Sequence, residues 1–241
     1  MISLDMALIK YLANLGYGTR RDVTGIVSAR RVTRADGTRL RDGDTFTHAD
    51  VRVDGEPLDP PAGSVIMLNK PVGYVCSTQD VPPLVYDLLP VRFLRRSPVI
   101  APAGRLDRDT SGLLLLTDDG ALNHRLTSPK RHVPKTYRVL LAEDVDHGVP
   151  ALFASGAMLL KGETKPLLPA AAEIISPREV EITLEEGRYH QVRRMFAAVG
   201  NHVVSLERIA IGGLRLSELA AGSWREASAD ERSQLREKFA G

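Results

Sequence analysis

Apolar side chains near the N-terminus recur at intervals of three and four residues, the spacing of an amphipathic helix. Gly16 follows the first run and predicts its end. Thr19 stands three residues before Asp22, as in a capping box, so a second helix is expected to begin just after it. The apolar positions are Leu4, Ala7, Leu8, Tyr11, Leu12 and Leu15 in the first helix, and Val23, Ile26 and Val27 in the second.

Alternating apolar and polar positions predict strands in much of the remaining chain. The four leucines at 113–116 form a run that is too short for a helix and lies between glycines, which predicts a buried strand. Residues 79–103 are rich in proline and end in Arg92, Arg95 and Arg96, so a basic surface loop is expected there. Strands are expected at 32–33, 51–53, 65–68, 135–141, 180–184, 203–204 and 209–211, and helices at 121–126, 192–199 and 229–239.

A proline-rich connector at 58–63 separates the N-terminal helices and short strands from the rest of the chain. We place a domain boundary there, between residues 1–59 and residues 60–241. The chain of 241 residues is 43% hydrophobic and 26% charged, which is typical of an ordinary globular protein. A core in the larger part and a smaller second domain are therefore expected.

The number of cysteines, the spacing of the histidines and the length of the apolar runs exclude several classes of protein. A single cysteine excludes an internal disulfide, and six histidines without close spacing give no reason to expect a metal. No apolar run approaches the roughly 18 residues of a spanning helix, and charged residues interrupt the N-terminus. We therefore expect no signal peptide, no contact with membranes and a cytoplasmic location.

Positive charge is concentrated near the N-terminus although the whole chain has a net charge of only +2. The first 41 residues contain eight Lys or Arg against three Asp, and seven of the eight cations are arginine. Arginine forms bidentate contacts with phosphate, so this region is a candidate for binding nucleic acid; an ordinary solvated helix face is the alternative. The candidate residues are Arg20, Arg21, Arg30 and Arg31.

The loop at 104–112 is the strongest candidate for chemistry. It contains two carboxylates and two arginines and leads directly into the leucine strand. A rigid element that holds the loop would suit a site that needs a fixed carboxylate, for which Asp107 is the candidate. The alternative is a turn in which Asp107 and Asp109 pair only with Arg105 and Arg108.

A second informative segment spans 188–200. Val192, Met195 and Phe196 fall on one helical face and are expected in the core. His190 and Arg194 point to the opposite side, whereas Arg193 flanks the apolar stripe, where its guanidinium can reach a half-buried carboxylate.

Four separated segments resemble the motif set of the pseudouridine synthases, in the same order. They are Asn-Lys-Pro-x-Gly at 69–73, Gly-Arg-Leu-Asp-x-x-Thr-Ser-Gly-Leu at 104–113, Lys-Thr-Tyr at 135–137 and Glu-Gly-Arg-Tyr-His-Gln-Val-Arg-Arg-Met at 186–195. The N-terminal helix-helix-strand pattern resembles the S4 RNA-binding domain. The resemblance implies an α+β fold, in which a small S4-like domain is joined to a catalytic domain with a mixed, mainly antiparallel sheet.

This resemblance also implies roles for particular residues in isomerising uridine to pseudouridine without a metal or organic cofactor. Asp107 corresponds to the aspartate that attacks the target nucleoside, and Arg105 to the arginine associated with the displaced base. Tyr137 corresponds to the aromatic residue that packs on the flipped uracil. Arg193 corresponds to the basic residue that pairs with the aspartate, and Lys70 to an active-site neighbour.

The domain order and the match through 196–204 resemble the small-subunit branch of the family. The implied substrate is 16S ribosomal RNA, free or in a small-subunit assembly particle, with the uridine at position 516 as target. A monomer is expected. Three alternatives remain: a synthase of the large-subunit branch, a non-catalytic RNA-binding assembly protein, and an N-glycosidase in which Asp109 would serve as the second carboxylate.

Overall fold

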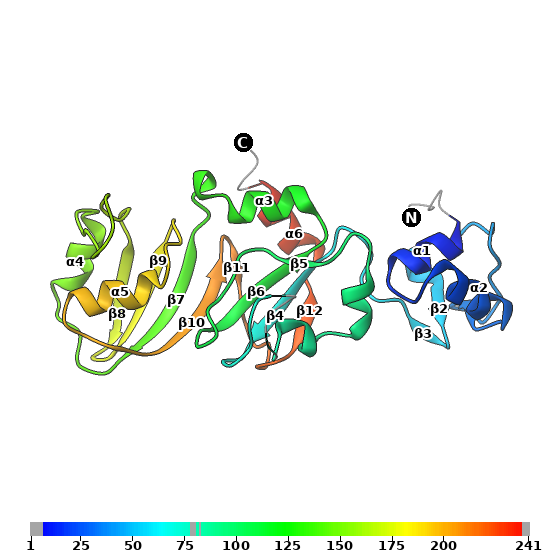
Figure 1. The fold of residues 1–241 in the computed structure, drawn as a ribbon, viewed down its shortest axis with the longest axis horizontal. Helices are drawn as coiled ribbons and strands as arrows, with labels where there is room; N and C mark the ends of the chain where they lie inside the picture. The colour runs from blue at the N-terminus through cyan, green and yellow to red at the C-terminus, as the bar shows by residue number, and fades with distance from the viewer. Residues whose placement is uncertain (1–6, 78–80, 82, 238–241) are drawn as a thin grey trace.

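The computed structural model describes residues 7–77, 81 and 83–237. Leu4 of the first expected helix, residues 79, 80 and 82 of the expected loop, and residues 238–239 of the last expected helix lie outside that range. In Figure 1 an N-terminal unit of helices and short strands lies at one end of an elongated molecule, and a long sheet with its helices fills the rest.

The N-terminal unit packs two helices on a three-stranded antiparallel sheet. Its elements are α1 (Leu8–Asn14), α2 (Arg20–Ser28), β1 (Val32–Arg34), the 3-10 turn η1 (His48–Asp50), β2 (Val51–Val53) and β3 (Glu56–Pro57). The expected capping box is confirmed, because Thr19 Oγ1 accepts from the Asp22 amide at 3.2 Å and Asp22 accepts from the Thr19 amide at 2.9 Å. Leu8, Leu12 and Val23 are fully buried between the layers.

A nine-stranded sheet forms the larger unit, in the order β12-β4-β6-β10-β7-β9-β8, with β5 on β6 and β11 on β10. Among the described strands only β6 and β10 pair in parallel, so the fold is α+β with a mainly antiparallel sheet, as expected. The strands are β4 (Val65–Lys70), β5 (Ala101–Pro102), β6 (Ser111–Thr117), β7 (Lys135–Leu141), β8 (Ala171–Ser176), β9 (Glu179–Leu184), β10 (Val203–Ile211), β11 (Leu214–Arg215) and β12 (Trp224–Glu226).

Helices and 3-10 turns cover this sheet. At one end α4 and α5 close a core against β7 to β10, and near the middle α3 and α6 lie over β6 and β11 (Figure 1). The helices are α3 (Gly120–Thr127), α4 (Val149–Ala154), α5 (Gln191–Ala198) and α6 (Ala229–Glu237), and the turns are η2 (Val85–Leu88), η3 (Val91–Arg95) and η4 (Pro129–Arg131). No described helix is long and apolar enough to cross a membrane.

The leucine strand β6 is buried on both faces. Leu113 and Leu115 pack in the cluster beneath α3 and α6, whereas Leu114 and Leu116 pack against the segment that contains η2 and η3. A strand covered on both sides needs apolar residues at every position, which explains the unbroken run in the sequence. β6 is therefore a rigid support for the loop that precedes it.

The expectation of a basic surface loop at 79–103 is wrong for the residues of its described part that pack in the core, although others, such as Val91, Arg95 and Val99, are exposed. Tyr86, Phe93 and Ile100 are buried against β4 and β6, because short 3-10 turns bury apolar side chains without a regular period in the sequence. The Arg96 side chain is only 1% exposed and lies 3.7 Å from Asp118. Of the three arginines, Arg95 alone is exposed.

The same segment joins the two units. Arg92 donates to both carboxylate oxygens of Asp59, at 2.6 and 3.0 Å, and Arg96 donates to the Pro60 carbonyl at 2.7 Å. Gly16 has φ +88°, and a Cβ there would lie 2.2 Å from the Arg92 carbonyl oxygen. The helix-ending glycine thus also allows close approach of the two units.

Candidate active site

Lys70 at the end of β4 fixes the loop at 104–112 from beneath. The side chain is fully buried, and its Nζ donates to the carbonyl oxygens of Thr110 at 2.7 Å, Asp107 at 3.1 Å and Pro71 at 3.1 Å. Burial lowers the pKa of this lysine. Lys70 was expected as an active-site neighbour, and it lies next to Asp107 through the main-chain carbonyl of that residue.

The loop is also held at its middle, by Arg108, and at its end, by Gly112. Arg108 Nε donates to the Gly73 carbonyl at 3.1 Å, and the Gly73 amide donates back to the Arg108 carbonyl at 2.7 Å. At Gly112 the backbone has φ +102°, and a Cβ would lie 2.3 Å from the Arg208 carbonyl oxygen of β10. Only glycine permits this approach of β6 to β10.

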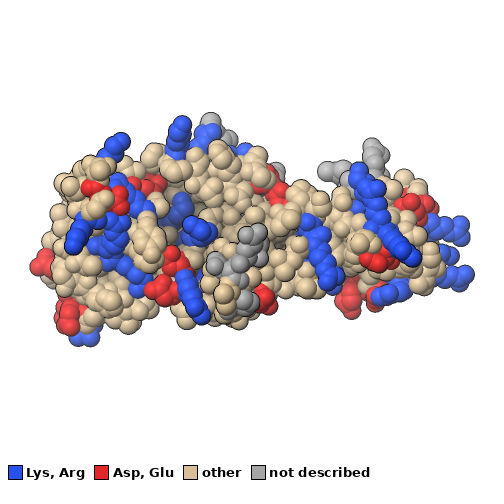
Figure 2. Space-filling view, viewed as in Figure 1, with Lys and Arg blue, Asp and Glu red and all other residues tan. Residues whose placement is uncertain are grey.

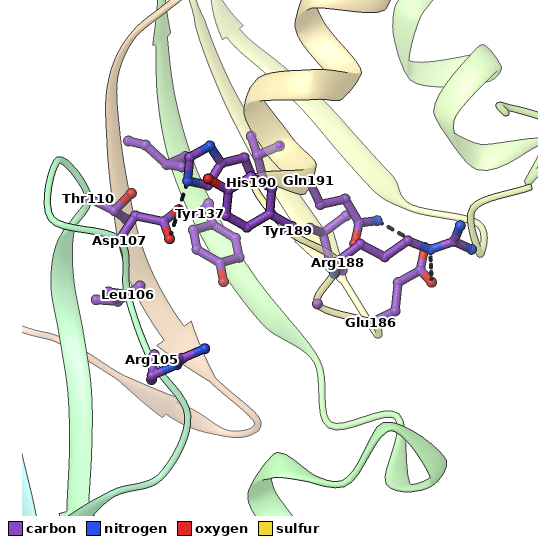
Figure 3. A pocket seen from close by; sticks show the side chains of 14 residues that line it. Arg105, Leu106, Asp107, Thr110, Tyr137, Glu186, Arg188, Tyr189, His190 and Gln191 are labelled. Carbon is purple, nitrogen blue, oxygen red and sulfur yellow. Dashed lines mark hydrogen bonds and ion pairs between the residues drawn. The ribbon is translucent and has the colours of Figure 1, made fainter. Parts of the chain in front are cut away.

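Asp107 lies where two cavities meet. One, of about 350 Å³, is also lined by Arg105, Tyr137 and His190, and the other, of about 860 Å³, lies toward Gly73. Figure 3 shows the Asp107 carboxylate, from the loop before β6, and the Tyr137 ring, from β7, facing the same space. The structure therefore brings Asp107 and Arg105 of one motif together with Tyr137 of another.

His190 lies beside the Asp107 carboxylate: its Nε2 is 3.7 Å from Asp107 Oδ1 (Figure 3). The residue precedes α5 in the left-handed region with φ +47°, and its ring stacks on Tyr189 at 3.9 Å between centroids. The helical period correctly directed His190 away from the core. Its contact with Asp107 was missed, because no local signal links residues 83 positions apart in the chain.

Arg193 does not pair with Asp107 in this structure. Its Nη2 lies 2.8 Å from Asp109 Oδ2 and donates to the Asp109 carbonyl at 3.1 Å, while Nη1 donates to the Val203 carbonyl at 3.2 Å. This guanidinium was expected to reach a half-buried carboxylate, and the carboxylate that it meets is Asp109, whose side chain is 63% exposed, two residues beyond Asp107. Asp109 is thus engaged in an ion pair with Arg193.

The wall opposite the loop is built by a network around Arg188. This guanidinium meets Glu186 at 3.0 Å and Glu163 at 3.2 Å, and Arg194 meets Glu163 at 2.8 Å. Gln191, only 4% exposed, donates to Glu186 at 2.9 Å. These contacts fix the turn before α5 and hence the position of His190.

The N-terminal arginines lie on the surface. Arg20, Arg21 and Arg30 are exposed and form no ion pair with a described residue, whereas Arg31 donates to both oxygens of Asp54 at 2.7 and 2.6 Å. Figure 2 shows blue side chains projecting from this unit, and more of them in the hollow near the middle of the larger unit. Within the described residues, no group of three His, Cys, Asp or Glu side chains could hold a metal ion.

A mainly antiparallel sheet thus presents one loop aspartate opposite a tyrosine, in a cavity that is also lined by Arg105 and Arg188. The RNA pseudouridylate synthase family model matches residues 64–198. The chain belongs to this family and is an RNA pseudouridine synthase.

Relatives match along nearly the whole chain. The ribosomal small subunit pseudouridine synthase A of Escherichia coli is 44% identical over 234 residues, covering 94% of this chain and 98% of its own. An uncharacterized RNA pseudouridine synthase of Bacillus subtilis is 42% identical and covers 96% of this chain and 99% of its own. A crystal structure of a pseudouridylate synthase superposes with a TM-score of 0.68 at 40% identity, covering 96% of this chain and 100% of that one.

Proposed function

We propose that this protein isomerises a uridine to pseudouridine in the RNA of the small ribosomal subunit, with Asp107 as the nucleophile. The observation that carries the proposal is the Asp107 carboxylate on a rigidly held loop, sharing a cavity with Tyr137. Similarity to the small subunit synthase of E. coli over nearly the full chain supports the 16S RNA as substrate. The proposed target is the uridine at position 516.

The proposed reaction needs one carboxylate and no added cofactor. An Asp107 oxygen attacks the target nucleoside, the N1–C1′ bond breaks, and the uracil turns within the cavity. A C5–C1′ bond then forms, the C5 proton leaves, N1 gains a proton, and Asp107 is released. Glycoside hydrolysis normally uses a second carboxylate to position water, and the ion pair between Asp109 and Arg193 disfavours that role.

The surrounding residues have proposed roles that follow from their positions. Tyr137 stacks on the flipped base, which offsets part of the cost of unstacking it from folded RNA. Arg105, exposed at the cavity, accompanies the displaced base and its former partner. Arg193 and Lys70 act by holding the loop, through Asp109 and through three carbonyls respectively.

Residues 1–59 are proposed to form an S4-like RNA-binding domain, with 60–241 as the catalytic domain. The separate sheet of β1 to β3 and the exposed Arg20, Arg21 and Arg30 support this division. Folded RNA is recognised largely through shape and phosphates, which suits an arginine-rich helical surface. We propose that the protein acts as a monomer in the cytoplasm, on free 16S RNA or on an assembling small subunit.

One assay tests the reaction and its nucleophile. 16S RNA carrying tritium at uracil C5 is incubated with the protein and with Asp107→Ala. Isomerisation releases label and leaves the chain intact, whereas a glycosidase frees uracil and a non-catalytic binder does neither. Undiminished release by Asp107→Ala would remove Asp107 from its proposed role. Mapping pseudouridines in ribosomal RNA from cells with and without the protein distinguishes the small-subunit from the large-subunit target.

A further inference from the structure

A smaller cavity of about 180 Å³ adjoins the one that contains Asp107. The two share Arg105, Tyr137 and Glu186, and the smaller one is lined in addition by Lys135 and Arg208. The proposed mechanism gives neither of these two cations a task. Both lie close to the loop at 104–112, Lys135 at the start of β7 and Arg208 within β10.

Arg208 is a buried charge whose donors are incompletely used. It is 2% exposed; its Nε donates to the Leu113 carbonyl at 2.8 Å, and its Nη1 lies 3.4 Å from the Arg105 carbonyl oxygen. Its Nη2 is buried and has no hydrogen-bond partner among the described residues, and none of their carboxylates forms an ion pair with it. Uncompensated buried charge is strongly unfavourable, so it marks a place where an anion would stabilise the protein.

Lys135 adds a second positive charge to this cavity. Its Nζ donates to the Val133 carbonyl at 2.8 Å, which leaves two of its three donor hydrogens for other acceptors. Burial, and then the charge of Arg208, lower the pKa of Lys135 to about 8. The two cations therefore repel each other, and a bound anion would relieve that repulsion.

The carboxylates near this cavity do not neutralise these cations. Glu186 lines it, but its oxygens accept from Arg188 at 3.0 Å and from Gln191 at 2.9 Å. Glu185 also lines it and is exposed, and it forms no ion pair with Lys135 or Arg208. The exposed Arg105 at the shared wall adds a third cation that an anion can contact.

We propose that the Lys135–Arg208 cavity is an anion subsite that binds a phosphate group of the RNA backbone beside the target nucleotide. Lys135 and Arg105 contact the phosphate oxygens, and Arg208 supplies positive charge from beneath. Because this cavity shares Tyr137 with the one at Asp107, a phosphate held there would fix the strand while the base enters. The identity of the RNA rests on the proposed function, whereas binding of phosphate does not.

Chemical labelling of the intact protein tests the subsite without any activity. Acetic anhydride is applied at low dose near pH 7.5, and acetylation of Lys135 is measured by mass spectrometry, with the exposed Lys165 as internal control. Inorganic phosphate should reduce labelling of Lys135 at least three-fold, and a short oligoribonucleotide should do so at lower concentration. Uridine, which lacks phosphate, should have no effect. Labelling of Lys135 that neither phosphate nor oligoribonucleotide changes would overturn the proposal, as would equal protection by uridine.

Single neutral linkages in the substrate identify the phosphate. A 16S-derived stem-loop is prepared with one methylphosphonate at a time at the linkages around the target uridine. At one linkage the neutral group should raise KM about ten-fold for the wild-type protein, the effect of losing one charge-assisted contact. Lys135→Met should raise KM on the unmodified RNA by a similar factor and change kcat little. Because the variant already lacks the contact with this phosphate, the neutral group at that linkage should not raise its KM further. Lys165→Met is the matched control and should behave as the wild type.

These outcomes separate the subsite from the proposed function. If Lys135→Met kept the same penalty as the wild type at every linkage, the subsite would be wrong even though the enzyme isomerises 16S RNA. If no 16S-derived RNA were isomerised but phosphate still protected Lys135, the substrate proposal would fail and the subsite would stand.

Discussion

Two sets of cations flank the loop at 104–112, the buried Lys70 on one side and the half-buried Lys135 with the buried Arg208 on the other, and they differ in how completely their donors are used. Lys70 has three carbonyl oxygens within 3.1 Å, all from the loop and its neighbour Pro71. Lys135 has one such acceptor, and Arg208 has a buried nitrogen with none among the described residues. A cation whose donors are all used holds the protein's own main chain, whereas a cation with unused donors leaves positive charge that a bound anion can neutralise.

The difference matters because a buried charge is costly unless its hydrogen bonds are made. Lys70 offsets its burial with contacts inside the protein, so the loop is held before substrate arrives. The hydrogen bonds that Lys135 and Arg208 form within the protein offset only part of the cost of burying their charges. A bound anion would offset more of it. Lys70 holds the loop that carries Asp107, and the Lys135–Arg208 cavity, which adjoins the cavity at Asp107, would hold RNA beside it.

The largest effect is expected at Asp107, on the loop that Lys70 holds. Asp107→Asn keeps the size of the side chain and removes its charge, and we expect the turnover rate to fall on the order of 10⁴-fold or more, as when other enzymes lose a nucleophile. Tritium release under single-turnover conditions measures it. Asp109→Asn, which disrupts the ion pair with Arg193, is the control and should retain far more activity. Equal losses in the two variants would contradict the assignment.

Removing Lys70, whose donors are all used, should cost stability. Lys70→Met leaves the Asp107 and Thr110 carbonyls without their donor, and we expect the free energy of unfolding to fall by about 3 kcal/mol. Urea unfolding followed by circular dichroism measures the change, and Lys165→Met should match the wild type within about 0.5 kcal/mol. Wild-type stability in Lys70→Met would mean that Lys70 does not hold the loop.

Removing Lys135, which has unused donors, should change how stability depends on pH. The pKa of Lys135 is about 8 in the folded protein, below its ordinary value of 10.5, so the unfolded chain binds more protons between these values. Wild-type stability should therefore rise relative to Lys135→Met by about 2 kcal/mol from pH 7.5 to 9.5. At pH 7.5 the variant should be at least as stable as the wild type. Parallel pH profiles of the two proteins in urea unfolding would argue against the lowered pKa.

The smallest effect is expected at cations that are neither buried nor paired. Arg20→Gln and Arg21→Gln should each weaken binding of folded RNA only a few-fold, and should each reduce the slope of log affinity against log salt by about one. Filter binding at several salt concentrations measures both quantities. Arg178→Gln, which removes an ion pair with Asp144 in the larger unit, should leave the slope unchanged. A change in affinity without a change in slope would exclude phosphate contacts by these arginines.

Local patterns predicted the parts of the fold that depend on near neighbours. The capping box at Thr19, the buried strand at the four leucines and the apolar face of α5 were all correct. The segment that contains η2 and η3 was not, because its buried residues have no regular spacing and Arg96 is a charged residue in an apolar setting. The resemblance of the motifs assigned Asp107, Arg105 and Tyr137 to one active site, and the structure places all three at one cavity.

The sequence by itself determined which loop carries the carboxylate, the core positions of the regular helices and strands, and the family to which the chain belongs, because these depend on short motifs, local periodicity and their order. Only the tertiary structure decided that Arg193 meets Asp109, that His190 meets Asp107, and that Arg208 is buried with an unused donor. The physical reason is that partners and burial arise where strands distant in the chain lie side by side. Gly112 of β6 packs against the backbone of Arg208 in β10 in this way, and no local pattern records the distance between them.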